Sequence, residues 1–459
     1  MRLDAASESA LRAALGDDGL LTDPADCLAY GYDNSRRQGE PIAVALPRDR
    51  TAVLAIVKAA RAAQLPLVAR GRGTNTTGAS VPARGALVVS FERMNRIIEI
   101  NPDDRLAVVE PGVLNGDLQR ALAPHGFFWA PDPTSADYST IAGNLACNAG
   151  GPRTVKYGAC RENVLGLSAV TGAGVLIRSG GRTTKGAVGY DLTRLLIGSE
   201  GTLALIVEAT LKLTPRPVAQ STLRACYGSV DAAARAVARI MAQPAIPCAL
   251  ELIDAHAVAL VVQQGVEIPA GTQALLLIEA DGDAAGLAAE LAQISAAARG
   301  EGLLALDQAD DAASAAHLWA ARKALSPALR QLAPKKINED VVVPVSALPA
   351  LLARLDALSA SAGIPIVNFG HAGNGNIHVN LLFDPALPGL AARAQALLAE
   401  VFDAVLALGG TLSGEHGIGL EKRDFMPRAL NAETLQLMRA IKRQFDPDGL
   451  LNPGKLLPD

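Results

Sequence analysis

The sequence predicts an α+β protein built from two or three domains, and three observations support this fold class. The chain has 459 residues, which is more than a single hydrophobic core usually accommodates. Half of the residues are hydrophobic and only 19% are charged, so the chain can bury a large core. Runs with the two-residue period of strands alternate with runs that have the 3.6-residue period of helices, which is typical of mixed α and β structure.

The first domain is predicted between residue 42 and about residue 215. Its strand-like runs are IAVAL, LPLVA, ALVVS, LAVVE and LALIVEATLKL, and the helical runs among them are TAVLAIVKAARAAQ and LNGDLQRALAPHG. Pro215 and Pro217 follow, and each removes a backbone donor and stiffens the chain. We therefore place a domain boundary at these prolines.

A ferredoxin-like layer is predicted from residue 218 to about residue 310. The order there is strand, helix, strand, short helix, strand, helix, strand, which is typical of a split βαβ arrangement. A helix with His317, Trp319 and Arg322 follows, then the apolar strand VVVPV and the helix LPALLARLDALSASAG. IPIVNFG and IHVNLLF form a predicted hairpin, and AETLQLMRAIKRQF is a helix that ends at Asp446.

Charge and composition exclude several classes of function. The net charge is −4 and no basic stripe with interleaved aromatic residues occurs, which argues against nucleic-acid binding. The start, MRLDAASESALRAALGDDG, has acids where a signal peptide needs an apolar core, and no apolar run is long enough for a membrane helix. We expect a cytoplasmic protein without an integral membrane segment, with peripheral attachment to the inner membrane as the alternative.

The five cysteines do not form a recognisable framework. They are odd in number, widely spaced and without a CxxC pair, which argues against disulfides, a zinc ribbon or an iron–sulfur cluster.

Three glycine-rich segments are candidates for holding an anionic ligand. They are RGRGTNTTG at 70–78, the stretch from Pro131 to Leu167, and GSEGT at 198–202. Glycine permits positive φ and close approach, so successive backbone N–H groups can converge on a pyrophosphate. One such cluster alone is more often a tight solvent turn. Three in one domain favour a ligand.

A fourth glycine cluster, VTGAGV at 170–175, is predicted to be a hairpin turn. It resembles the start of a dinucleotide fingerprint, but the third glycine is missing and VLIRSGG continues as a strand rather than a helix. No GxxxxGK[ST] sequence occurs, so a P-loop enzyme is not supported.

The hairpin sequence GHAGNGNIHVN indicates a metal site. Its alternation can bring His371 and His378 together across the glycine-rich mouth of the hairpin, and Glu415 in SGEHGIG is a suitable anionic third ligand. Three protein ligands leave positions open for a substrate, as in catalytic sites. The alternative is that these histidines are hydrogen-bonded residues of a polar turn.

Cations for a carboxylate substrate are available nearby in the sequence. Arg322 has the planar fork that suits a carboxylate, and Lys335 and Lys336 follow in PKKINEDVVVP. Surface salt bridges are the alternative for all three side chains.

These motifs together resemble a known family. RGRGTNTTG, PDPTS, STIAGN, NAGG, VKYGACREN, GYDL, GSEGTLALIVEATLKL, GHAGNGNIHVN, GEHGIGLEKR and NPGK occur in one order from about residue 40 onward. The chain is similar to the flavin-dependent 2-hydroxyacid dehydrogenases of the vanillyl-alcohol oxidase superfamily, which include D-lactate (cytochrome), D-2-hydroxyglutarate and glycolate oxidase subunit enzymes.

The resemblance implies a domain plan. It implies a PCMH-type FAD-binding domain at 1–217, with its core at about 38–216, and a substrate or cap domain at 218–410 with the ferredoxin-like layer and the histidine hairpin. A C-terminal segment at 411–459 is expected to pack back on the FAD domain and complete the active site.

The resemblance also implies roles for individual residues. His371, His378 and Glu415 would bind a divalent metal ion (zinc, manganese or iron), and His416 would be the general base. Substrate contacts would come from Arg322, Ser326, Lys336 and Asn380. The residues expected to hold FAD are Arg70, Gly71, Arg72, Gly73, Thr74, Gly78, Pro131, Pro133, Thr134, Ser135, Thr140, Gly143, Asn144, Gly150, Gly151, Tyr157, Gly158, Glu200, Gly201, Thr202 and Ile206.

Two positions depart from the family pattern. Some members attach the flavin to a histidine of the first glycine loop, but Thr74 and Asn75 occupy that stretch here, so we expect non-covalent FAD. Arg72 replaces the middle glycine of the usual RGGGT pattern, which affects the details of this loop and not the fold.

The expected activity is oxidation of a D-2-hydroxy acid to a 2-oxo acid. INEDVVVPVS most resembles the D-lactate dehydrogenases, with D-2-hydroxyglutarate and glycolate as alternatives. The electron acceptor would be a quinone, a cytochrome or an electron-transfer flavoprotein. The oligomeric state stays open, with a homodimer as one option. A metal-dependent hydrolase with the same ligands is the alternative from another class, although it leaves the glycine-rich segments unexplained, and a flavin-binding subunit without turnover is a third.

Overall fold

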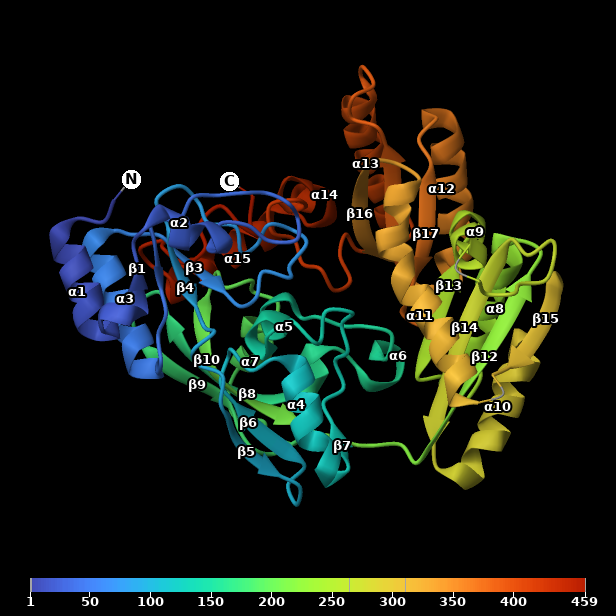
Figure 1. The fold of residues 1–459 in the computed structure, drawn as a ribbon, viewed down its shortest axis with the longest axis horizontal. Coiled ribbons are helices and arrows are strands. Elements are labelled where there is room, and N and C mark those ends of the chain that lie inside the picture. The colour runs from blue at the N-terminus through green and yellow to red at the C-terminus, as the bar shows by residue number, and fades with distance from the viewer. Residues whose placement is uncertain (1, 264, 310, 459) are drawn as a thin grey trace. The chain divides into compact units, whose positions relative to one another are not determined.

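The structure is a computed structural model that describes residues 2–263, 265–309 and 311–458, apart from the side chains of residues 321, 323, 324 and 327. The chain forms two compact units (Figure 1). The first unit extends to Gly150 and also contains residues 158–216 and 415–459. The second unit contains residues 151–157 and 217–414, so one boundary lies between Arg216 and Pro217.

The first unit contains two main sheets. A four-stranded sheet has the order β1-β2-β4-β3, in which β2, β4 and β3 are parallel. A five-stranded antiparallel sheet has the order β5-β6-β10-β8-β9, and β7 pairs with β11. The strand bounds are β1 (Leu20–Leu21), β2 (Ala43–Ala45), β3 (Leu67–Arg70), β4 (Leu87–Ser90), β5 (Ile97–Asn101), β6 (Leu106–Val109), β7 (Phe127–Phe128), β8 (Val164–Thr171), β9 (Leu176–Gly180), β10 (Ala204–Lys212) and β11 (Thr214–Pro215).

Helix α3 of the first unit follows its sequence pattern closely. In α3, buried Val53, Ile56, Val57 and Ala60 form one apolar stripe at helical spacing, and the Asp49 carboxylate caps the start of the helix. The helix bounds are α1 (Ala5–Leu15), α2 (Pro24–Cys27), α3 (Arg50–Ala63), α4 (Asn115–Leu122), α5 (Ile141–Cys147), α7 (Leu192–Leu196), α14 (Met426–Ala429) and α15 (Ala432–Phe445).

The turn predicted at VTGAGV is confirmed. β8 and β9 pair antiparallel on either side of it, with Val170 opposite Leu176, and Gly174 has the positive φ of a tight turn. No helix follows these glycines, because residues 176–180 continue the sheet.

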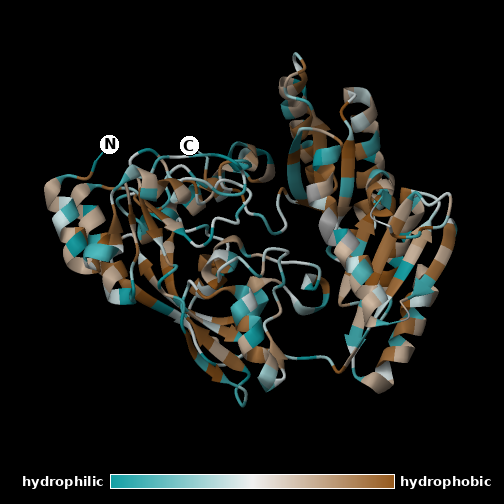
Figure 2. Ribbon diagram, in the orientation of Figure 1, coloured by the Kyte–Doolittle hydropathy of each residue, from teal (hydrophilic) through white to brown (hydrophobic). Residues whose placement is uncertain are grey.

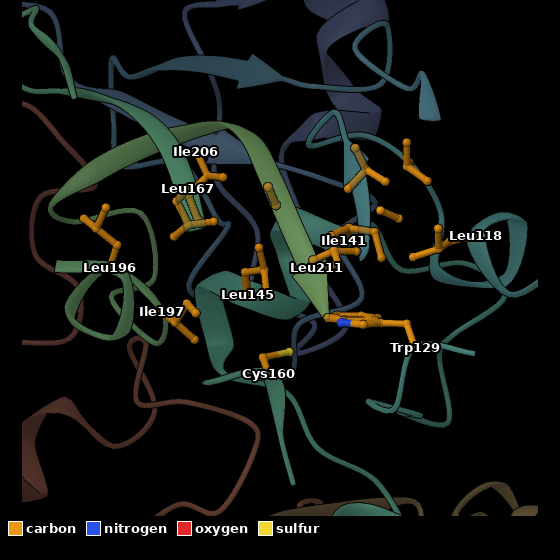
Figure 3. Close-up of a cluster of buried hydrophobic side chains, with 14 of the residues drawn as sticks. Leu118, Trp129, Ile141, Leu145, Cys160, Leu167, Leu196, Ile197, Ile206 and Leu211 are labelled. Carbon is orange, nitrogen blue, oxygen red and sulfur yellow. The ribbon is translucent and has the colours of Figure 1, made fainter. Parts of the chain in front are cut away.

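Part of the second glycine-rich segment is helical, because Ile141–Cys147 form helix α5. Ile141 and Leu145 project from this helix into a buried cluster with Leu167, Leu211 and the indole of Trp129 (Figure 3). The apolar contacts of this face outweigh the low helix propensity of Gly143, which lies on the other side of the helix.

The second unit is built on one antiparallel sheet with the order β15-β12-β14-β13-β17-β18-β16 (Figure 1). The order of β15, β12, β14 and β13 is that of a split βαβ layer, which confirms the ferredoxin-like prediction. The hairpin of β17 and β18 extends this layer. The strand bounds are β12 (Ala219–Tyr227), β13 (Ala249–Ile253), β14 (Ala274–Gly282), β15 (Leu303–Gln308), β16 (Lys335–Val342), β17 (Ile366–Gly370) and β18 (Asn376–Phe383).

One strand of this sheet differs from the prediction. VVVPV, at 341–345, was expected to be the strand, but β16 begins at Lys335 and ends at Val342. Pro344 has no N–H for a strand ladder, whereas the polar residues before Val341 pair with β18 from Lys335 onward.

Helices cover both faces of the seven-stranded sheet. Leucine, valine and alanine side chains from α9 and α11 join Ile253, Leu277 and Phe369 in one core cluster. α8, α10, α12 and α13 pack side by side over the other face, and Figure 2 shows much of the sheet in the hydrophobic colour. The helix bounds are α6 (Thr154–Tyr157), α8 (Val230–Ala242), α9 (Ala255–Gln263), α10 (Ala284–Ala298), α11 (Ala312–Ala328), α12 (Leu348–Ala362) and α13 (Leu390–Ala407).

Among the described residues, the stretch Val345–Ala362 is the one helix with the length and hydropathy of a membrane span. Its leucines at positions 348, 351, 352, 355 and 358 are all buried within the second unit. They recur at helical spacing with Arg354 and Asp356 between them, which is the pattern of a core helix.

Candidate functional site

A cavity in the first unit brings the three glycine-rich segments together. Segment 70–78 contributes Arg70 and Gly71, α5 and its cap contribute Thr140 and Gly143, and the third segment contributes Gly201. Ile206 of β10 also lines it, so six of the predicted cofactor residues lie around one space. The remaining lining residues are Ala69, Phe91, Pro111, Ala142, Ala146, Ser199 and Ala204.

Close backbone approach explains the glycine at position 71. A Cβ on Gly71 would lie 2.3 Å from the hydroxyl oxygen of Thr140, too close for any side chain. The same hydroxyl accepts a hydrogen bond from the N–H of Gly143 and caps α5. The first glycine loop and the start of α5 are therefore fitted to each other at the cavity wall.

The side chain of Arg70 has a structural role. Its guanidinium donates to the carbonyls of Tyr32 (2.7 Å) and Ala29 (3.1 Å), and lies over the ring of Tyr30. Burial lowers the pKa of Arg70. These contacts hold the glycine loop on residues 29–32, so Arg70 shapes the cavity through its position at the end of β3.

Glu200 fixes the C-terminal loop. Its side chain is buried and accepts hydrogen bonds from the N–H groups of Ile418 (2.6 Å) and Gly419 (2.8 Å). Burial raises the pKa of Glu200 to about 7, although these bonds and the nearby charges of Lys422 and Lys455 act in the opposite direction. The glutamate of the third glycine segment thus contacts the loop that follows His416.

The other predicted cofactor residues are not among the described residues that line the cavity. Asn144 is buried against Ser139 and Asn115, and Thr202 donates to the carbonyl of Ser199. The rest of this set is Arg72, Gly73, Thr74, Gly78, Pro131, Pro133, Thr134, Ser135, Gly150, Gly151, Tyr157, Gly158 and Glu200.

Tyr157 lies in the second unit, where its hydroxyl is 2.8 Å from both oxygens of the Asp281 carboxylate. Burial, together with this carboxylate, raises the pKa of Tyr157 well above its usual range. Lys156 also binds Asp281, at 2.7 Å, so residues 151–157 are tied to β14.

The predicted histidine hairpin is confirmed. Phe369 of β17 is paired with His378 of β18, and His371 follows β17 directly. The two imidazole rings have centroids 5.2 Å apart and are nearly perpendicular. A positive φ at Gly375 allows the tight return, where a Cβ would lie 1.9 Å from the carbonyl oxygen of Val343.

A buried carboxylate supports the first of these histidines. Oε1 of Glu251, on β13, lies 2.5 Å from Nδ1 of His371, and Oε2 lies 2.5 Å from the guanidinium of Arg322. Burial raises the pKa of Glu251, but the charges of His371 and Arg322 outweigh burial and lower it to about 2. Arg322 also lies over the Phe369 ring, 4.8 Å from its centroid.

The structure brings the three predicted metal ligands together. One ligand atom from each of His371, His378 and Glu415 lies within 4.8 Å of the others. Two imidazoles and a carboxylate are also the donor types of catalytic zinc sites, and this donor set fits a divalent ion.

His416 follows Glu415 directly. Its backbone carbonyl accepts from the Asn75 side chain (3.2 Å), and its Nε2 lies 4.0 Å from Oε1 of Glu415. The imidazole is partly exposed, with 19% of its side-chain surface accessible. His416 therefore lies next to one member of the ligand set and is accessible to solvent.

The predicted substrate residues are distributed over α11 and the hairpin sheet. Lys336 donates to the hydroxyl of Ser326 at 2.7 Å, so these two side chains are next to each other. Asn380 is buried and donates to the carbonyls of Val367 and His378. Its amide oxygen has no hydrogen-bond partner among the described residues, which leaves one acceptor for a ligand.

Sequence reasoning missed Glu251. The only signal was a carboxylate inside the apolar strand ALELI, a position where a charged residue is seldom buried without partners. The partners, His371 and Arg322, are distant in the sequence and could not be assigned from it.

Comparisons with known proteins agree on one family. Residues 216–456 match the FAD linked oxidases, C-terminal domain, and residues 41–180 match the FAD binding domain. The glycolate oxidase subunit GlcD of Bacillus subtilis is 39% identical, covering 94% of this chain and 92% of its own length. D-2-hydroxyglutarate dehydrogenase of Xanthomonas citri is 37% identical (95% and 94%), and D-lactate dehydrogenase of Archaeoglobus fulgidus is 34% identical (94% and 95%).

Solved structures share the fold at lower identity. p-Cresol methylhydroxylase with substrate bound superposes with a TM-score of 0.83 at 17% identity, covering 99% of this chain and 96% of that one. 4-Ethylphenol oxidase from Gulosibacter chungangensis gives a TM-score of 0.78 at 19% identity, covering 99% and 97%.

Proposed function

The chain belongs to the FAD-linked oxidases of the vanillyl-alcohol oxidase superfamily, and on that premise we propose that it oxidises a D-2-hydroxy acid, with D-lactate preferred, to the 2-oxo acid. The PCMH-type α+β fold expected from the sequence is confirmed, and the chain is an FAD-dependent oxidoreductase. This membership disfavours the metal-dependent hydrolase, which has no use for an FAD-binding domain.

One observation carries the proposal. His371, His378 and Glu415 offer three ligand atoms within 4.8 Å, and His416 follows the last of them directly. A 2-hydroxy acid has a hydroxyl and a carboxylate that together chelate a divalent ion, so a three-ligand set with open positions suits this substrate class. The neighbouring imidazole provides a base for the hydroxyl proton.

The cofactors supply the difficult chemistry. FAD, when bound, accepts the hydride from the α-carbon of the substrate, and a divalent metal ion, when bound, acts as a Lewis acid toward the hydroxyl group. The protein supplies position, charge and a proton acceptor.

In this proposal, residues of the chain bind, orient and deprotonate the substrate. The guanidinium of Arg322 and the ammonium of Lys336 attract the substrate carboxylate, and the Ser326 hydroxyl adds a hydrogen bond. An imidazole nitrogen of His416 accepts the hydroxyl proton, for which a neutral histidine is suited near neutral pH. Proton and hydride leave together, and the 2-oxo acid is the product.

The proposed FAD site is the cavity lined by the three glycine-rich segments. Thr74 and Asn75 occupy the stretch where some members carry a flavin-linked histidine, so we propose that FAD is held without a covalent bond. The Asn75 side chain is engaged: its oxygen accepts from the N–H groups of Thr77 and Ala79, and its amide donates to the carbonyl of His416.

The preference for D-lactate rests on Ile337–Ser346, which resembles the D-lactate dehydrogenases most. The similar proteins carry three different names, and they support the class of small 2-hydroxy acids rather than one member. We propose a quinone, cytochrome or electron-transfer flavoprotein as the electron acceptor, and a cytoplasmic location.

An anaerobic spectrum tests this function. The purified protein should have the yellow absorption of oxidised flavin, and D-lactate should bleach it faster than L-lactate, D-2-hydroxyglutarate or glycolate. Faster bleaching by one of the other acids would identify that acid, rather than D-lactate, as the preferred substrate within the same class. A yellow protein that no 2-hydroxy acid bleaches would identify it as a flavin-binding subunit without turnover, and the proposal would fall.

A further inference from the structure

We propose that Glu251 is a positioning residue that uses the two oxygens of one buried carboxylate to orient the metal ligand His371 and the substrate-binding Arg322 together. This inference rests on the proposed function, because it concerns the same ligand set and the same substrate carboxylate. In this inference Glu251 acts through His371 and Arg322 and does not itself contact the ion or the substrate.

Each oxygen of the Glu251 carboxylate contacts a different side chain. Glu251 is fully buried in the middle of β13, with Oε1 at 2.5 Å from Nδ1 of His371 and Oε2 at 2.5 Å from the guanidinium of Arg322. The two partners come from different elements, the loop after β17 and helix α11. One side chain therefore sets the spacing between them.

The contact with His371 fixes the imidazole for metal binding. When Nδ1 donates its proton to a carboxylate, the lone pair of Nε2 is left for an ion, and the ring cannot rotate without breaking the contact. The nearly perpendicular arrangement with His378 depends on the same ring orientation. Carboxylates in this position commonly tune metal affinity.

The contact with Arg322 fixes the substrate cation. The guanidinium is held from one side by Oε2 of Glu251 and stacks on the Phe369 ring, and 11% of its side chain is accessible. Its Nε is buried and has no hydrogen-bond partner among the described residues. A planar group held at two places keeps its direction, which two-point recognition of a carboxylate requires.

Glu251→Gln tests this role because glutamine keeps the shape of the glutamate side chain but has one hydrogen-bond acceptor oxygen fewer. A glutamine can turn its carbonyl toward His371 or toward Arg322, but its amide then faces the other donor. Glu279→Gln is the matched control. Glu279 is a buried carboxylate on the neighbouring strand β14, paired with Ala249, and its contacts are with Arg153 (3.7 Å) and Cys248 (3.5 Å).

Four measurements on the FAD-loaded protein separate a positioning role from a loss of stability. Zinc and manganese titrations after dialysis against a chelator should show metal affinity about 10- to 100-fold weaker in Glu251→Gln and unchanged in Glu279→Gln. The KM for D-lactate should rise in Glu251→Gln, while flavin content and unfolding midpoint stay close to those of the control. Equal metal affinity and equal KM in a folded Glu251→Gln protein would overturn the inference and leave the proposed function standing.

Histidine NMR gives a readout that needs no metal and no turnover. With selectively labelled histidine, the wild type should show a strongly downfield Nδ1 proton that disappears in His371→Ala and in Glu251→Gln but remains in Glu279→Gln. If the wild type binds no metal but shows this proton, the proposed metal role fails and the orienting contact stands. If the wild type lacks the proton, the inference about Glu251 is overturned.

Discussion

Replacement of Glu200 by Gln should remove a pH dependence from the stability of the first unit. The buried carboxylate has its pKa raised from 4.5 to about 7, chiefly by burial. Between these values the folded state holds a proton that the unfolded state has released, so stability falls as pH rises and levels off above about 7. At 1.36 kcal/mol per pKa unit, wild-type stability should drop by roughly 3 kcal/mol over this range because of this group.

The glutamine keeps a hydrogen-bond acceptor for the loop that contains Ile418 and Gly419. Its carbonyl can still accept from Ile418 or Gly419, and it cannot ionise, so the roughly 3 kcal/mol loss should be absent. The difference in unfolding free energy between variant and wild type should therefore be small near pH 5 and should grow in favour of the variant toward pH 8.

A single tryptophan can report on the first unit. The chain has two, Trp129 in the core of the first unit and Trp319 on α11 of the second. In a Trp319→Phe background, urea unfolding followed by Trp129 fluorescence at several pH values, with saturating FAD throughout, isolates the unit of interest. Glu208→Gln, on the strand β10 of the same unit, is the control for loss of a half-buried carboxylate. Parallel pH profiles for Glu200→Gln and wild type would refute the reasoning.

Three further outcomes are expected. His416→Ala should bind FAD normally but reduce it with D-lactate at least about 100-fold more slowly in stopped-flow spectra; a normal rate would remove its role as base. Gly71→Ala should lose flavin on gel filtration, because the added Cβ would lie 2.3 Å from the Thr140 hydroxyl. The control Gly181→Ala should keep its flavin, because no atom lies within 4 Å of the added Cβ. Equal flavin content in the two variants would contradict the role of Gly71 in the cavity wall. Chelation followed by dialysis should abolish flavin bleaching and zinc or manganese should restore it, and full activity in metal-depleted protein would exclude the metal role.

The sequence predicted the regular parts of the fold because local patterns determine them. The hairpin at 366–383 has clear alternation around a glycine turn, and its register follows from these two features. Helix α3 has an apolar stripe and a capping aspartate. The four strands of the ferredoxin-like layer also follow from the order of the patterns.

The rest depends on contacts between distant residues. The helix at Ile141–Cys147 exists because its apolar face meets a core that includes Trp129 and Leu211, although its centre contains Gly143 and Asn144, two residue types that are common in loops. Strand β16 begins at Lys335 because β18 offers it a partner, which no local pattern shows. Glu251 becomes part of the candidate site only when α11 and the hairpin arrive from elsewhere in the chain.

The last 45 residues of the chain return to the first unit, and this order has a consequence for synthesis on the ribosome. The side chain of Asn452 donates to the carbonyls of Ala79 and Glu200, and Leu451 bridges to Leu67 at the start of β3. These partners are translated long before Asn452 leaves the exit tunnel. The first unit therefore lacks these contacts during synthesis until residues 415–459 have left the exit tunnel.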